Sequence, residues 1–249
     1  MAHEVTGALS PPAAPMRMRD SGRWLYLGMA ILVAVVVVSG FSRTIGGNLL
    51  HPKVPRPRIL WVHAAVFFSW VLLFTAQAAL VRTRRVRWHR RLGIAGLALG
   101  STVVILGVAT VLVMARFDIA QEPSRRVQVL AFLAIPFNDL LCFATTFAAA
   151  AWLRKRPEHH RRLMLIATCC LTSAAFGRLP FVPLPALRVY GGVDLLLAIA
   201  VAIDWLATRR VHTVYRIALP PIVLGQAIAM TLFFARPPFW IALAQRVVG

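Results

Sequence analysis

The sequence predicts an all-α polytopic integral membrane protein, a bundle of about seven transmembrane helices. Hydrophobic residues make up 59% of the 249 residues, and the mean hydropathy is +0.72. Apolar runs of about 20 residues recur along the chain, and this is the length that a helix needs to cross the hydrocarbon core of a bilayer. A soluble chain would instead alternate polar and apolar faces.

We expect three segments along the chain. Residues 1–23 are polar and rich in Pro and Ala, which predicts a disordered cytoplasmic tail. Residues 24–236 form a single membrane domain whose first run has no convincing signal-peptide cleavage site and is therefore a retained anchor. Residues 237–249 are too few to span and are expected to lie in the membrane interface. The seven predicted spans are residues 24–41, 59–81, 92–115, 127–153, 163–181, 189–207 and 217–235.

The positive charges predict the orientation of these spans. On the side of the N-terminus lie 17 of the 28 Lys and Arg residues, and 11 lie on the other side. Because basic residues concentrate in cytoplasmic loops, the N-terminus is predicted to be cytoplasmic and the C-terminus outside. The predicted location is the bacterial inner membrane.

The net charge of +20 does not indicate a nucleic-acid partner, because the arginines crowd into short loops between apolar runs. The expected partner of these loops is the bilayer, through its anionic headgroups. Cys142, Cys169 and Cys170 lie inside apolar runs without Cys-x-x-Cys spacing, so they are interpreted as small buried side chains.

Small residues and prolines predict local features of individual spans. The third span carries Gly93, Gly100 and Gly107 at seven-residue steps, which indicates close helix packing. Pro136 in the fourth span and Pro220-Pro221 in the seventh predict kinks or a delayed helix start. The later spans also pair into similar hairpins with a His near the start of each returning helix, which suggests a duplication.

Polar residues inside the spans nominate a first site. An ionisable group near the bilayer centre costs roughly 2.5–3.5 kcal/mol on insertion scales, so each needs a partner. Counting depth at about 1.5 Å per residue, we predict an Arg178–Asp194 ion pair near the outer boundary, with His63 beside it and a second polar group below. The alternative is a buried pair that only fixes helix packing. The predicted buried polar cluster comprises His63, Asn138, Asp139, Arg178, Asp194 and Gln226.

Two histidines at the predicted cytoplasmic boundary nominate a second site. The chain repeats His-Arg-Arg-Leu at residues 89–92 and 160–163, each time where a helix is predicted to begin. His89 and His160 are therefore expected at matching depth on parallel helices, where two imidazoles could ligate one haem b and neighbouring arginines its propionates. The alternative is that both histidines are ordinary interfacial residues. No metal site and no catalytic residue are predicted, and no His-Glu-x-x-His, Walker or Gly-x-Ser-x-Gly motif indicates a hydrolase or NTPase.

The motifs within residues 40–182 resemble an uncharacterised family of bacterial predicted membrane proteins. The residues that carry this resemblance are Phe41-Ser42-Arg43-Thr44, Trp61-Val62-His63, Trp70-Val71-Leu72-Leu73-Phe74 with Gln77, His89-Arg90-Arg91-Leu92-Gly93, His160-Arg161-Arg162-Leu163-Met164 and Arg178-Leu179-Pro180. The resemblance implies an inner-membrane location and no activity. Histidines on successive helices are also similar in plan to diheme transmembrane cytochromes b, but the fourth span offers Asn138-Asp139 and no His, so two haems are not expected.

Three functions follow as hypotheses. The first is a non-catalytic protein for membrane assembly or homeostasis, with a membrane-protein partner or a second copy of itself. The second is a redox protein with one haem b on His89 and His160. The third is a small-solute or proton transporter that uses Asp139, Asp194, Arg178 and His63.

Overall fold

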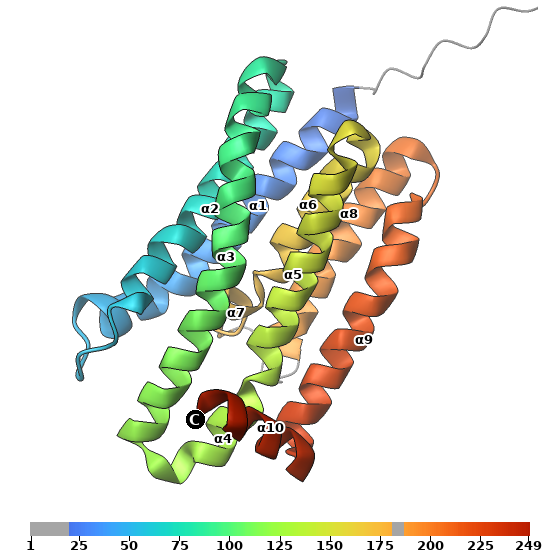
Figure 1. Cartoon of the computed structure of the whole chain (residues 1–249). Helices are drawn as coiled ribbons and strands as arrows, with labels where there is room; N and C mark the ends of the chain where they lie inside the picture. Colours follow the sequence, from blue (N-terminus) through green and yellow to red (C-terminus); the bar gives the residue numbers. More distant parts are fainter. Residues whose placement is uncertain (1–19, 181–186) are drawn as a thin grey trace, which may run out of the picture.

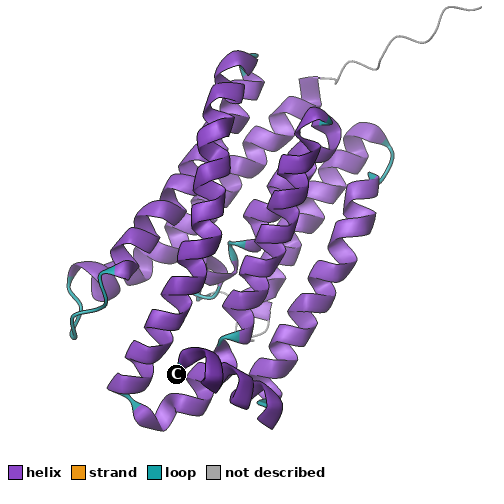
Figure 2. Cartoon of the chain, in the orientation of Figure 1, coloured by secondary structure: helices purple, strands orange, loops and turns teal. Residues whose placement is uncertain are grey.

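The computed structural model describes residues 20–180 and 187–249, so most of the predicted disordered tail lies outside the described residues. Within the described stretches every regular element is helical, which confirms the predicted all-α class (Figure 2). The main helices are α1 (Asp20–Ile45), α2 (Ile59–Arg82), α3 (Val86–Gln121), α4 (Arg126–Phe132), α5 (Ala134–Trp152), α6 (Pro157–Cys170), α7 (Ser173–Phe176), α8 (Gly192–Thr208), α9 (Thr213–Ala235) and α10 (Pro238–Val248). Short helical turns η1 (Gly46–Leu50), η2 (Pro123–Arg125), η3 (Leu153–Lys155) and η4 (Leu187–Gly191) join them.

The long helices run side by side as an elongated bundle (Figure 1). The described part of α1 begins at one end, where the connections α2–α3, α5–α6 and α8–α9 also lie, and we call this the basic end. The α1–α2 and α3–α4 connections and α10 lie toward the other end, which we call the opposite end. The basic segments therefore gather at one end as the charge count predicts.

The exposed faces of the long helices carry large apolar side chains. Six described helical segments are long and apolar enough to cross a membrane. Large apolar side chains project from them, such as Ile94 and Ile105 on α3, which are 73% and 72% exposed. So much exposed apolar surface along a whole bundle is stable only in hydrocarbon. The chain is an integral membrane protein.

The structure differs from the prediction at the fifth span, residues 163–181. This segment divides into α6, of 14 residues, and α7, of 4 residues, and neither is long enough to span alone. Thr172 bonds its hydroxyl back to the Cys169 carbonyl at 2.6 Å, and the Thr172 amide bonds the same carbonyl at 3.0 Å. The Leu171 amide likewise bonds to Thr168, three residues back, so the regular α-helical ladder ends here. The fifth predicted span is a broken helix.

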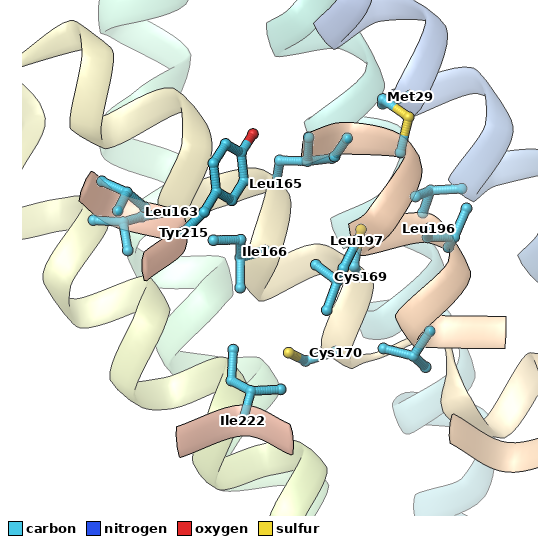
Figure 3. Packing of buried hydrophobic residues seen from close by; sticks show 14 of the residues in the cluster. Met29, Leu163, Leu165, Ile166, Cys169, Cys170, Leu196, Leu197, Tyr215 and Ile222 are labelled. Carbon is cyan, nitrogen blue, oxygen red and sulfur yellow. The ribbon is translucent and has the colours of Figure 1, made fainter. Parts of the chain in front are cut away.

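Four buried apolar clusters hold the described helices together. The largest joins α1, α2, α5, α6, α8 and α9, and Figure 3 shows Tyr215 beside aliphatic residues of α6. A second lies between α2, α3, α5 and α6, where the Trp70 ring packs edge-on against Phe143 at 5.2 Å.

The predicted glycine packing is confirmed at Gly100 and Gly107, whereas a Cβ on Gly93 would make only an ordinary contact with Gln77 at 3.9 Å. A Cβ on Gly100 would overlap the ring of Phe147, and one on Gly107 would overlap Leu140, so α3 approaches α5 closely at both positions. Gly40 has the same role on α1, because a Cβ there would overlap the main chain of Ala175 in α7.

The prolines act differently from one another. The α4–α5 break falls at Leu133, three residues before Pro136, as expected for a proline that clashes with the preceding turn. Pro220 and Pro221 lie inside the continuous α9. Among the described residues of the C-terminal segment, α10 leaves Phe239, Leu243 and Val247 exposed on one face, which suits a helix lying in the membrane interface.

Candidate functional site

The basic end brings the two predicted histidines together. His89 and His160 are each the fourth residue of their helices, α3 and α6, so they enter the bundle at the same depth. Their ring centroids lie 6.4 Å apart, and the ring planes are nearly perpendicular, at 77°. His160 Nδ1 lies 2.8 Å from the carbonyl oxygen of Ala150 on α5. The predicted matching depth is confirmed.

A second pair of histidines lies at the same end. The rings of His159 and His212 are 4.9 Å apart. His212 caps α9, because its Nδ1 accepts a hydrogen bond from the Val214 amide at 3.2 Å. Burial lowers the pKa of His212, and the positive charges of Arg162 and His159 lower it further.

An ion pair that the sequence analysis missed lies beside these histidines. Arg162 is 1% exposed, and it donates from Nε and Nη2 to the two carboxylate oxygens of Asp204 on α8, at 2.9 and 2.7 Å. Its Nη1 donates to the carbonyl and the carboxylate of Glu158, at 2.7 and 2.8 Å. The arginines of the repeat were interpreted as lipid anchors, and for Arg162 that is wrong. The available signal was Asp204 itself, one of only 8 acidic residues in a chain with 28 basic ones.

Several buried polar atoms near the basic end have no hydrogen-bond partner among the described residues. They are Gln77 Oε1, Arg82 Nε and Arg161 Nε, whereas the Tyr26 hydroxyl lies near Arg161 and Tyr215, and His89 lies near the backbone of Gln77. The guanidinium of Arg82 stacks over the Trp24 ring at 3.9 Å, and that of Arg161 over the Tyr26 ring at 5.1 Å. A buried polar atom that loses its partner costs about 1–3 kcal/mol, so such a concentration indicates a polar ligand or water at this end.

The predicted polar cluster is brought together only in part. Arg178 donates to the Thr44 hydroxyl at 3.1 Å and to the Ala174 carbonyl, and its guanidinium lies 4.5 Å from the centroid of the Phe41 ring. No Arg178–Asp194 ion pair forms among the described residues, so that pairing is wrong. The break after α6 turns Arg178 toward α1, where the Thr44 hydroxyl and the Phe41 ring contact it, while the Ala174 carbonyl of α7 accepts its other hydrogen bond.

The remaining predicted residues divide between two places. His63 stacks on Phe67 with ring centroids 4.0 Å apart. The imidazole of His63 also lies near the positive charge of Arg178. Asp194 lies within hydrogen-bonding reach of Gln226, and its Oδ1 has no partner among the described residues.

Asp139 is the centre of a separate group, which we call the Asp139 cluster: Asn138, Asp139, Ser173 and Tyr190. The carboxyl of Asp139 accepts a hydrogen bond from the Ser173 hydroxyl at the start of α7. Asn138 Nδ2 donates to the Tyr190 hydroxyl at 3.2 Å, and Tyr190 also lies within reach of Asp139. The sequence analysis missed Ser173 and Tyr190, because only the break after α6 and the turn η4 bring their hydroxyls to α5.

No protein-family model, no curated protein sequence and no solved structure matches the chain. The geometry of the two sites therefore carries the functional argument.

Proposed function

We propose that the protein is a redox protein of the bacterial inner membrane that holds one haem b between His89 and His160. The observation that carries this proposal is the 6.4 Å separation of the two ring centroids. An imidazole nitrogen binds a first-row metal at about 2 Å and lies roughly 1 Å from its ring centre, so two imidazoles on opposite sides of one metal have centroids about 6 Å apart.

The hydrogen bond of His160 favours the tautomer that a haem ligand needs. A carbonyl oxygen can only accept, so the neutral His160 ring donates from Nδ1 to Ala150 and leaves Nε2 free to bind a metal. Holding one ring nitrogen in this way also fixes the direction of the imidazole. The donor set of two histidines suits a haem, whose porphyrin supplies the other ligands.

Charged groups near the histidines suit the rest of a haem. Arg82 ends α2 at the same end of the bundle and has an unpartnered buried Nε. Arg161 follows His160 directly, and its Nη2 is paired with Glu158. Guanidinium groups bind carboxylates through paired hydrogen bonds, so Arg82 is the candidate for one propionate, and Arg161 would have to release Glu158 to bind the other. A bound haem supplies one-electron chemistry. The side chains around it hold it and set its potential through ligand orientation and burial.

The two other hypotheses have weaker support. Transport of a small solute or proton loses the Arg178–Asp194 pair, which does not form among the described residues, and keeps Asp139 and Asp194 as separate acids. A role in assembly or homeostasis has no specific contact in its favour.

The visible spectrum of the purified protein tests the proposal. We expect the full chain, expressed with a supply of haem, to show a Soret band that shifts on reduction. His89→Ala and His160→Ala should each reduce or abolish the band, and added imidazole should restore part of it.

His159→Ala is the matched control, because His159 lies next to His160 but its ring faces His212. It should keep the spectrum of the unmodified protein. A preparation with no Soret band, or a band unchanged in both His89→Ala and His160→Ala, would overturn the proposal.

A further inference from the structure

We propose that Asp139 is a proton-binding site inside the membrane that exchanges its proton with the opposite end of the bundle through Asp194. This inference is independent of the haem, because it rests on the Asp139 cluster and on the broken helix α6–α7. It assigns to that cluster a ligand, the proton, and a route by which the ligand arrives.

The surroundings of Asp139 favour the neutral acid. The residue is 8% exposed, and no described Lys, Arg or His forms an ion pair with it. Its hydrogen-bond neighbours are the uncharged Ser173, Tyr190 and Asn138. An unpaired carboxylate in such a place loses its hydration without compensation, whereas a carboxylic acid does not.

The other titratable groups near Asp139 bring no positive charge. They are Tyr190 on η4, Cys142 on α5 and Cys170 on α6. From α9, the buried Gln226 follows Gly225, which packs against Asn138, and an amide does not titrate. No neighbouring positive charge therefore stabilises the ionised form of Asp139.

The broken helix brings a hydroxyl to Asp139. The Ser173 hydroxyl, at the start of α7, donates to the carboxyl. The carbonyls of Thr168, Cys169 and Thr172 at the break accept backbone amides, and no cluster of three or more His, Cys, Asp or Glu side chains occurs in the described stretches. A proton on Asp139 removes the buried charge without any further ligand.

The proposed route from Asn138 to Asp194 passes along α9. Gly225 of α9 lies against the amide oxygen of Asn138, and a Cβ at that position would overlap it. The next residue, Gln226, is buried and within reach of Asp194 on α8. Asp194 is half-buried and has an oxygen without a partner, so it is suited to pass a proton between water and the interior.

Infrared difference spectroscopy of the full chain in lipid vesicles tests the site. At neutral pH we expect the carbonyl band of a buried carboxylic acid, which shifts when the sample is moved into heavy water. Asp139→Asn should remove the band. If that variant fails to fold, Asp139→Glu should move the band to another frequency, and Ser173→Ala should shift it because the hydroxyl partner is lost.

The exchange rate of the same band tests the route. Asp194→Asn should slow its exchange in heavy water severalfold. The matched control is Asp118→Asn, an exposed acid near the C-terminal end of α3, which should leave the rate unchanged. The absence of a carboxylic acid band, or one that neither Asp139 variant alters, would overturn the site, and an unchanged rate in Asp194→Asn would overturn the route. Neither readout requires haem, so these results stay distinct from the spectral test of His89 and His160.

Discussion

The two copies of His-Arg-Arg-Leu have the same letters and the same place in their helices, yet their arginines have opposite environments. Arg91, in the first copy, is exposed, and its guanidinium lies 5.4 Å from the centroid of the Trp88 ring. Arg162, in the second copy, is 1% exposed and paired with Asp204 and Glu158. The histidines of the two copies meet, with ring centroids 6.4 Å apart.

Residues outside the repeat cause this difference. The second residue of α6 is Glu158, four positions before Arg162, whereas the second residue of α3 is Arg87. The α8 helix also presents Asp204 to α6, and no described acid forms an ion pair with Arg91. A repeated motif therefore predicts depth along the helix, but its neighbours decide what each side chain binds.

Substituting the two arginines should give the largest contrast. Arg162→Met should destabilise the protein by about 3–5 kcal/mol, because it leaves Asp204 buried without a counter-charge. Arg91→Met should change stability by no more than about 0.5 kcal/mol, because it removes only a surface contact. Thermal unfolding of the purified variants in the same detergent measures both.

A double variant separates charge from packing in that result. Arg162→Met with Asp204→Leu should recover much of the lost stability, since an apolar pair of similar size needs no compensation. Equal losses for Arg91→Met and Arg162→Met would show that the two arginines have the same role, contrary to their burial.

His212, which lies near Arg162 of the second copy, should add a smaller, pH-dependent effect on stability. The pKa of His212 is lowered in the folded protein by burial, and further by Arg162 and His159. The unfolded chain therefore binds the proton more readily, and stability should fall as the pH drops through the ordinary histidine range, near 6.5, toward the lower folded value. Above that range the contribution is fully present.

His212→Asn is the variant that isolates this effect. Asparagine can accept the Val214 amide and keep the cap of α9, but it does not titrate. Melting temperatures measured between about pH 7.5 and pH 5.5 should fall less in this variant than in the unmodified protein. A fall of the same size in both would assign the pH dependence to other groups.

The sequence predicted the helices and the relation between His89 and His160 because both follow from position along a helix. Apolar length identifies a span, and two histidines at the start of parallel helices reach the same depth. Neither inference needs to know which helices are neighbours. The six apolar helices and the 6.4 Å ring separation agree with them.

The contacts between side chains of different helices could not be predicted from position along a helix. Depth placed Arg178 near Asp194, but the break after α6 turns Arg178 toward Thr44. The same break brings Ser173 to Asp139. At the break the amides of Leu171 and Thr172 bond to carbonyls three residues back, a local change that apolar length does not reveal.

Exchanging the second residues of the two helices should give the smallest effect and the most direct test of the comparison. Arg87→Glu would place an acid four residues before Arg91, as Glu158 stands before Arg162. Because Arg91 is exposed, the new pair should add no more than about 0.5 kcal/mol. Glu158→Arg should cost more than that, because Glu158 binds a guanidinium that is 1% exposed, although its own side chain is 49% exposed. Thermal unfolding of the two variants decides the matter: if Glu158→Arg cost less than Arg87→Glu gained, the difference between the two copies would lie in Asp204 alone.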